Sequence, residues 1–322
     1  MQQPTSTEHA RGAALRRLSS TISLFTAVAL VAVKLLAWIA TGSVAILASV
    51  VDGLVDTGAG FATYFGVRYA ERPPDHHHRF GHGKGEALAA FTQATFLVGA
   101  AFVLAVQSVQ RLVYPQLINS LDVGLSVIVA SLVASLALVI MQSWVVRRTG
   151  STAIAADRAH YLTDVAVNVA VLIALGVTKL TGWTRADPIL ALAISGYMLW
   201  NAYGIAVHAL AQLLDRELSD DDRQRIKEAI LACDGVRSMH DLRTRFSGDR
   251  TFIEYHIEID GTLPIERGHA IGDATERALK NLLPGTVDAT AHMEPFGIDD
   301  ERLDEQVNAR SQSTARAEET RR

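Results

Sequence analysis

Two pairs of potential metal ligands stand four positions apart inside strongly apolar segments of the chain. Asp52 and Asp56 form the first pair, and His160 and Asp164 form the second. A separation of four residues places both members of a pair on one face of a helix. Each ionised side chain inside a membrane costs about 3 kcal/mol or more unless it is paired or coordinated. Three carboxylates and one imidazole form a four-ligand set for a divalent metal, and tetrahedral geometry suits zinc.

A purely structural role is the alternative for these residues, because polar side chains in membranes also form hydrogen bonds between helices. Two matched pairs favour a transport site over that interpretation. Ligands must be deprotonated to bind metal. When the metal leaves, three neighbouring carboxylates in a medium of low dielectric constant favour the protonated form. We therefore expect the movement of metal to be coupled to an opposite movement of protons.

A second group of potential ligands lies in the segment PPDHHHRFGHGK. An aspartate and several histidines close together beside a metal pathway form a plausible ligand set. The alternative is a solvated hydrophilic loop that binds metal weakly. The glycines of this segment do not form the GxxxxGK[ST] pattern of a phosphate-binding loop, so nucleotide binding is not indicated.

The intramembrane pairs require membrane-spanning helices, and the chain contains six apolar stretches. Its 322 residues are 49% hydrophobic and 20% charged, with a net charge of −4 and one cysteine. This composition is too apolar for an ordinary soluble enzyme, does not indicate nucleic-acid binding, and excludes an internal disulfide. About 20 apolar helical residues cross a bilayer. The stretches that reach this length are 21–40, 44–67, 87–113, 121–146, 153–180 and 189–214.

The distribution of Lys and Arg predicts the orientation of these spans. Basic residues concentrate before the first span, between the second and third, and between the fourth and fifth. By the positive-inside rule, these segments and both termini lie in the cytoplasm. The first apolar run is too long for the core of a signal peptide, so we expect it to be retained as a span.

The residues after the sixth span predict a polar α+β domain. Ser219 precedes three aspartates, which is typical of a helix N-cap with an acidic first turn. The pattern predicts helices over 219–232 and 264–282 and strands over 236–246, 251–259 and 286–293. The tail is charged and poor in large apolar residues, so we expect it to be disordered. The expected parts are a cytoplasmic N-terminal segment (1–18), a six-helix transmembrane domain (19–214), a cytoplasmic domain (215–296) and the tail (297–322).

Several segments resemble the cation diffusion facilitator family. They are LASVVDGLVDTGAGF, FGHGKGEALAA and AIAADRAHYLTDVAVNVA in the apolar part, and LLDRELSDDDR and HDLRTRFSG in the polar part. The resemblance covers about residues 15–296 and is greatest to the bacterial zinc and ferrous-iron efflux branch. It implies a homodimeric transporter of the bacterial inner membrane with six transmembrane helices and a cytoplasmic ferredoxin-like α+β domain, exchanging divalent metal for protons.

The same resemblance implies further site residues. Glu294 stands where close relatives have aspartate, and Met293 occupies a position that is polar in them. The alternatives are a solvated loop, ordinary surface histidines, and charges that extend to the membrane surface. The implied sets are a loop metal site of Asp75, His78 and His82, a cytoplasmic metal site of His240, His256, His269, His292 and Glu294, and a dimer interlock between Lys84 and Asp215.

We therefore expect a proton-coupled exporter of Zn²⁺ and Cd²⁺, with Fe²⁺ as a further candidate, and a divalent metal bound in the cytoplasmic domain as a regulatory or structural ion. No HExxH motif occurs, and a four-ligand site leaves no position for catalytic water, so an enzyme is not expected. The alternatives are an exporter that prefers Fe²⁺ or Mn²⁺ and a membrane metal sensor without transport. The expected partners are a second copy of the chain, protons and membrane lipid, but no nucleic acid.

Overall fold

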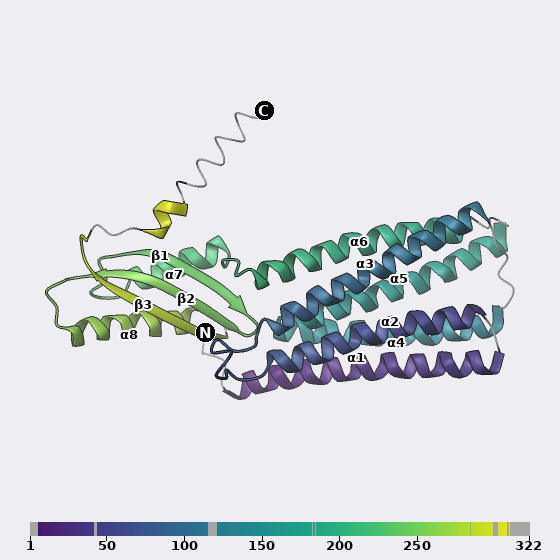
Figure 1. The fold of residues 1–322 in the computed structure, drawn as a ribbon, viewed down its shortest axis with the longest axis horizontal. Coiled ribbons are helices and arrows are strands. Elements are labelled where there is room, and N and C mark those ends of the chain that lie inside the picture. Colours follow the sequence, from purple (N-terminus) through teal and green to yellow (C-terminus); the bar gives the residue numbers. More distant parts are fainter. Residues whose placement is uncertain are drawn as a thin grey trace, which may run out of the picture. The chain divides into compact units, whose positions relative to one another are not determined.

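A computed structural model describes residues 6–41, 44–114, 121–181, 183, 185–283, 285–298, 302–307 and 309. The chain divides into two compact units, one of residues 10–213 and the other mainly of the residues from Leu214 onward. Six long helices form the first unit, which we call the helical unit. A small sheet with two helices forms most of the second, which we call the C-terminal unit (Figure 1).

The helices of the first unit follow the six apolar stretches in order. They are α1 (Ser6–Thr41), α2 (Val44–Ala70), α3 (Gly85–Val113), α4 (Leu121–Thr149), α5 (Thr152–Thr181) and α6 (Ala186–Leu213). Among the described residues, four segments are long and apolar enough to cross a membrane. These segments are Arg11–Ile39, Gly85–Val113, Val129–Thr149 and Pro188–Leu213. The other two helices, α2 and α5, carry the candidate intramembrane ligands.

Small residues allow the helices of the first unit to approach closely. Helix α3 packs along α6, and α4 packs along α5 (Figure 1). Ala90 of α3 and Ala209 of α6 are fully buried in a shared cluster. Gly66 of α2 faces Ala89 of α3 so closely that a Cβ atom added at Gly66 would lie 2.3 Å from the Ala89 Cβ. Close backbone approach at small residues is the usual basis of helix packing in membranes.

The C-terminal unit has the expected α-β-β-α-β order. Its elements are α7 (Asp220–Leu231), β1 (Ser238–Ser247), β2 (Arg250–Ile259), α8 (Ile265–Leu282) and β3 (Thr286–Pro295). The strand order is β1-β2-β3, with β1 antiparallel and β3 parallel to β2. The parallel pair requires the crossover that α8 provides. The described residues thus form a small mixed sheet, and the ferredoxin-like class remains a prediction.

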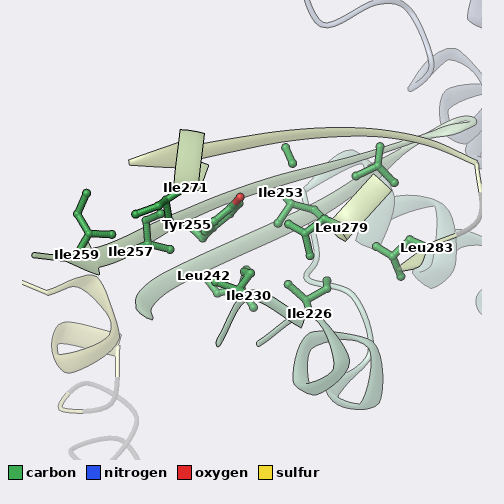
Figure 2. Close-up of a cluster of buried hydrophobic side chains, with 12 residues drawn as sticks. Ile226, Ile230, Leu242, Ile253, Tyr255, Ile257, Ile259, Ile271, Leu279 and Leu283 are labelled. Atoms are coloured by element: carbon green, nitrogen blue, oxygen red, sulfur yellow. The ribbon is translucent and has the colours of Figure 1, made fainter. Parts of the chain in front are cut away.

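Alternation along β2 separates a core face from a ligand face. Ile253, Tyr255 and Ile257 are buried with Ile226 of α7 and Leu279 of α8, and Figure 2 shows these side chains together in the core. Successive side chains of a strand point to opposite faces. The intervening residue His256 is therefore directed away from this core. Helix α7 begins as expected, because the Ser219 hydroxyl accepts a hydrogen bond from the Asp222 backbone N–H at 3.2 Å.

A short segment of the charged tail contacts the sheet, although its composition predicted disorder. Residues 303–307 are helical, and the backbone N–H groups of Leu303 and Asp304 each donate to the Asp241 carboxylate at 2.9 Å. Arg302 pairs with the buried Glu258 at 2.7 Å. Composition does not reveal such an ordered segment, because its partners lie 44 to 63 residues away in the sequence. Most of the remaining tail lies outside the described residues.

Candidate metal centres

Three of the four expected transport ligands converge between α2 and α5. The Nε2 atom of His160 lies 3.1 Å from Asp56 Oδ1 and 3.9 Å from Asp164 Oδ2. One ligand atom from each residue falls within 4.8 Å of the others, which suits a shared cation. The His160 side chain is only 5% exposed, whereas about 30% of each carboxylate side chain is accessible. The imidazole therefore lies on the closed side of the cluster and the carboxylates on the open side.

The fourth expected ligand, Asp52, lies in α2, but its side chain is outside the part that the structure describes. Asn168, one turn beyond Asp164, donates its side-chain amide to the Asp164 backbone carbonyl at 2.8 Å. This bond holds the Asn168 amide along its own helix. Lys34 of α1 faces α2, because a Cβ added at Gly53 would lie 3.7 Å from the Lys34 Nζ atom. The ammonium group of Lys34 therefore lies beside the helix that carries both aspartates.

The ligand cluster opens onto a pocket inside the helical unit. This pocket has a volume of about 290 Å³, and Asp56 and Asp164 line it together with apolar residues of α3 and α6. A second pocket of about 180 Å³ shares Gln107 with the first and continues to Arg111, in the last turn of α3. The two pockets together extend from the ligands toward the C-terminal end of α3.

Ion pairs that are largely buried join helix ends at the opposite end of the helical unit. Arg16 of α1 lies 3.3 Å from Glu71, which follows α2, and 3.2 Å from Glu86, in the first turn of α3. Arg17 also pairs with Glu71, and the Ser151 hydroxyl donates to Glu86 at 2.6 Å. Because Arg16 and Glu86 are less than 10% exposed, these contacts are shielded from solvent and join the ends of several helices.

The expected loop ligands Asp75, His78 and His82 are close together in the structure. Asp75 Oδ1 lies 3.3 Å from His78 Nδ1, and Asp75 Oδ2 lies 3.4 Å from His82 Nε2. Hydrogen bonds from the backbone N–H groups of His78 and His77 lower the pKa of the Asp75 carboxyl. Asp75 is therefore held in the ionised form that binds metal. His82 is buried against Tyr69, whereas Asp75 and His78 remain accessible to an ion.

Three histidines form a row across the ligand face of the C-terminal sheet. His240 is paired with His256 in the register of β1 and β2, and His256 with His292 in that of β2 and β3. Glu294 Oε2 lies 3.2 Å from His240 Nε2, and Glu294 Oε1 lies 2.7 Å from His256 Nδ1 and 3.5 Å from His292 Nε2. A carboxylate surrounded by three imidazoles is a ligand set suited to zinc. Two triads place their ligand atoms within 4.8 Å of one another, one of His256, His292 and Glu294 and one of His240, Asp241 and His256, so each triad fits a bound divalent metal.

The structure clarifies the remaining members of the expected cytoplasmic site. His269 lies on α8, where its side chain is 71% exposed and lies 3.7 Å from Asp273. None of the potential metal-binding groups among the described residues includes it. Met293 points toward α8, because a Cβ added at Gly272 would lie 3.4 Å from the Met293 sulfur. The thioether therefore lies on the face of the sheet that α8 covers, while His292 and Glu294 share the opposite, ligand face.

The two residues of the expected interlock belong to different units. In the helical unit, the Lys84 ammonium group donates to the backbone carbonyl of Leu213 at 3.1 Å. In the C-terminal unit, Asp215 has a positive φ of 56° and lies 3.4 Å from Arg245. The interlock between Lys84 and Asp215 remains a prediction.

Two aspartates beside the candidate sites were not selected from the sequence. Asp157 is buried in α5, one turn before His160, and its charge within an apolar segment was a usable signal. Asp241 follows His240 at a shift in the β1–β2 register, and one of its oxygens lies within reach of His240 and His256. Although burial opposes the effect, hydrogen bonds from the Asp304 and Leu303 backbone N–H groups lower the pKa of the Asp241 carboxyl. No sequence pattern indicates this contact with the tail.

Apolar helices around one cluster of potential metal ligands, together with a separate unit bearing another, are the arrangement expected of a membrane protein that handles metal ions. The sequence matches the family described as "Cation efflux transmembrane domain" over residues 20–214 and that described as "Cation efflux protein, cytoplasmic domain" over residues 218–296. The chain therefore belongs to the cation efflux family, whose members are transporters and not enzymes.

Two curated relatives agree with this assignment. Two proteins described as "Cation-efflux pump FieF", from Klebsiella pneumoniae subsp. pneumoniae and Salmonella paratyphi A, are each 44% identical over 270 residues. Each match covers 84% of this chain and 89% of the relative. A solved structure of a candidate zinc transporter, CzrB, in its Zn form is 35% identical, covering 27% of this chain and 99% of that chain with a TM-score of 0.24.

Proposed function

We propose that this protein exports divalent metal ions in exchange for protons, with Zn²⁺ as the principal substrate and Cd²⁺ and Fe²⁺ as further substrates. The observation that carries the proposal is the convergence of Asp56, His160 and Asp164 beside a pocket inside the helical unit. The similarity to proteins described as cation-efflux pumps supports the direction of transport. Asp52 completes the ligand set in this proposal.

The ligand chemistry favours zinc over manganese. His160 contributes an imidazole nitrogen, and the described carboxylates contribute oxygen. Zinc binds well to a tetrahedral set of mixed nitrogen and oxygen ligands, whereas Mn²⁺ prefers an octahedral set rich in oxygen. An exporter that prefers Fe²⁺ or Mn²⁺ is the alternative within the same family.

Proton exchange follows from the charge of the ligand set. Metal binding requires deprotonated carboxylates and a neutral imidazole. After the metal leaves, the carboxylates repel one another in surroundings of low dielectric constant, which favours protonation during the return step. Neutralisation by protons allows the empty site to change its access from one membrane face to the other.

The proposal places the protein in the bacterial inner membrane with six spans and both termini in the cytoplasm. Helices α2 and α5 cross the membrane with the other four, because their charged residues face the metal pathway rather than lipid. The pockets that reach Arg111 form the release route, and the ion pairs of Arg16 close the cytoplasmic entrance in this conformation. A site accessible from one face at a time fits alternating access.

The cytoplasmic domain joins two copies of the chain in this proposal. A metal held by His240, His256, His292 and Glu294 would neutralise charge on the sheet surface and stabilise the dimer. His269 lies on α8, outside the cluster that these four residues form within one chain, so it would not bind the metal together with them. Asp75, His78 and His82 would gather metal near the entrance, and Lys84 with Asp215 would strengthen the dimer near the lipid surface.

Transport by the purified protein in lipid vesicles tests the proposal. Vesicles containing a pH-sensitive dye are exposed in turn to Zn²⁺, Cd²⁺, Fe²⁺ and Mn²⁺, and metal and proton movements are followed together. The expected result is metal flux with an opposite proton flux, fastest for Zn²⁺ or Cd²⁺. Metal binding without flux would instead support a membrane sensor, and flux without proton movement would remove the exchange mechanism.

A further inference from the structure

Asp157 lies at the centre of a buried polar cluster that connects four helices. Its side chain belongs to α5 and is only 1% exposed. Asp157 Oδ2 accepts hydrogen bonds from the Ser23 hydroxyl of α1 and the Gln142 amide of α4, both at 2.6 Å. Asp157 Oδ1 accepts a third from the Gln93 amide of α3 at 3.0 Å. One carboxylate therefore fixes α5 against three neighbouring helices.

The cluster is connected to the imidazole of the transport site through Tyr161. The Tyr161 hydroxyl donates to the Ser23 backbone carbonyl at 3.3 Å. The Tyr161 ring packs edge-on against the His160 ring, with centroids 5.7 Å apart. A rotation of α5 or a shift of Ser23 would therefore move Tyr161 and, with it, change the orientation of the His160 ring.

His160 depends on this indirect support. A metal-binding histidine usually donates its second ring nitrogen to a carboxylate or carbonyl group that sets the ring orientation. The Nδ1 atom of His160 is buried and has no hydrogen-bond partner among the residues that the structure describes. Apart from the 3.1 Å contact of its Nε2 atom with Asp56, the ring is therefore held by the rotation of α5 and by the packing of Tyr161.

We propose that Asp157 is a positioning residue of the transport site. Asp157, His160 and Asp164 lie three and four residues apart and share one face of α5. The three hydrogen bonds to Asp157 fix the rotation of that face and so hold His160 and Asp164 toward Asp56 of α2. This inference rests on the proposed function only where it calls the ligands His160, Asp164 and Asp56 a transport site. The effect of Asp157 on their metal affinity does not depend on whether metal is transported.

Equilibrium Zn²⁺ binding to the purified full-length protein tests this role. The parent protein carries Asp75→Asn and Glu294→Gln, which weaken the other two candidate sites. Asp157→Asn keeps the size of the side chain but replaces one acceptor with a donor, and it is expected to raise the Kd about tenfold, as loss of a supporting group near a metal does. Tyr161→Phe is expected to produce a smaller rise in Kd.

Ser195→Ala is the matched control, because the buried Ser195 hydroxyl also joins two helices, donating to the Ala101 carbonyl at 2.9 Å. The Kd of this variant should stay within about twofold of the parent, since the Ser195 hydrogen bond joins α6 to α3 and does not involve α5. An unchanged Kd in Asp157→Asn, or an equal rise in Ser195→Ala, would overturn the proposal. If Asp157→Asn does not fold, Tyr161→Phe decides: a raised Kd supports the proposal and an unchanged Kd overturns it. Absence of flux in the wild-type protein would instead contradict the proposed function.

Discussion

The Nε2 atom of His160 lies 3.1 Å from Asp56 Oδ1 and thereby links α5 to α2 across the candidate transport site. This contact brings together residues 104 positions apart in the chain. It also places a nitrogen ligand directly beside a carboxylate oxygen, which is the combination that favours zinc. The metal preference of the protein should therefore depend on His160.

Replacing that nitrogen with oxygen should change the metal preference. In His160→Asp, the described ligands become carboxylates only, which favours metals that prefer oxygen. We expect Zn²⁺ transport to weaken and Mn²⁺ transport to improve relative to it. Competition between the two metals for uptake into vesicles measures the change. The ligand assignment would be wrong if His160→Asp retained the wild-type order of metals.

The cytoplasmic cluster should lose metal affinity most strongly at Glu294. Because this carboxylate lies within 3.5 Å of three histidines, Glu294→Gln should weaken Zn²⁺ binding at least as much as loss of a residue that supports a ligand does, which is roughly ten- to a hundredfold. His269→Ala should cause a smaller loss, since His269 lies on the exposed side of α8. Zn²⁺ titration of both purified variants compares the losses. A larger loss in His269→Ala would contradict the single-chain ligand set.

The close contact between α2 and α3 should not tolerate a methyl group at Gly66. A Cβ atom there would lie 2.3 Å from the Ala89 Cβ, so the helices must separate. Gly66→Ala should cost about 1–3 kcal/mol of stability and lower the melting temperature of the detergent-solubilised protein. Gly58→Ala is the control, because its Cβ would meet Phe96 at an ordinary 3.6 Å. Equal melting temperatures for the two variants would show that the contact is looser than described.

Tyr255 should make the C-terminal unit sensitive to alkaline pH. Burial raises the pKa of Tyr255 from 10.0 to about 12. The folded chain therefore favours the neutral phenol. This contribution is fully present below pH 10, where the phenol is neutral in both states, and is lost as the pH rises toward 12. The loss is at most about 1.4 kcal/mol per pH unit.

Melting of the C-terminal unit within the full-length protein between pH 9 and pH 11.5 measures this effect. Tyr255→Phe should be less stable at neutral pH, because it loses the 2.8 Å hydrogen bond with Thr275, but its stability should fall less steeply above pH 10. Tyr114→Phe is the control, since the Tyr114 side chain is exposed. Parallel curves for Tyr255→Phe and the wild type would contradict the assignment of the alkaline loss to Tyr255.

Hydropathy located the long helices but not all of their ends. The fifth apolar stretch, 153–180, agrees closely with α5 (Thr152–Thr181). The first stretch began at residue 21, whereas α1 begins at Ser6. The segment before residue 21 contains Ala, Leu and Arg, which are good helix formers but are not uniformly apolar. Hydropathy detects the part of a helix that suits a membrane and not the hydrogen-bonded turns that precede it.

The spacing of potential ligands predicted that His160 and Asp164 lie together in the candidate transport site, but it did not predict their surroundings. A separation of four residues places His160 and Asp164 on one face of α5 without reference to other helices. The contact of His160 with Asp56 depends on how α2 and α5 pack, and the cluster around Asp157 depends on three further helices. These arrangements result from tertiary packing, which local periodicity does not encode.

The central claim is that metal crosses the membrane through the site containing Asp56. The most direct test compares Zn²⁺ flux and internal pH in vesicles carrying the wild type, Asp56→Ala, or the matched control Ser195→Ala. We predict Zn²⁺ flux with opposite proton movement in the wild type and the control, and loss of both movements in Asp56→Ala at equal protein content. Zn²⁺ flux at the wild-type rate in Asp56→Ala would contradict this account.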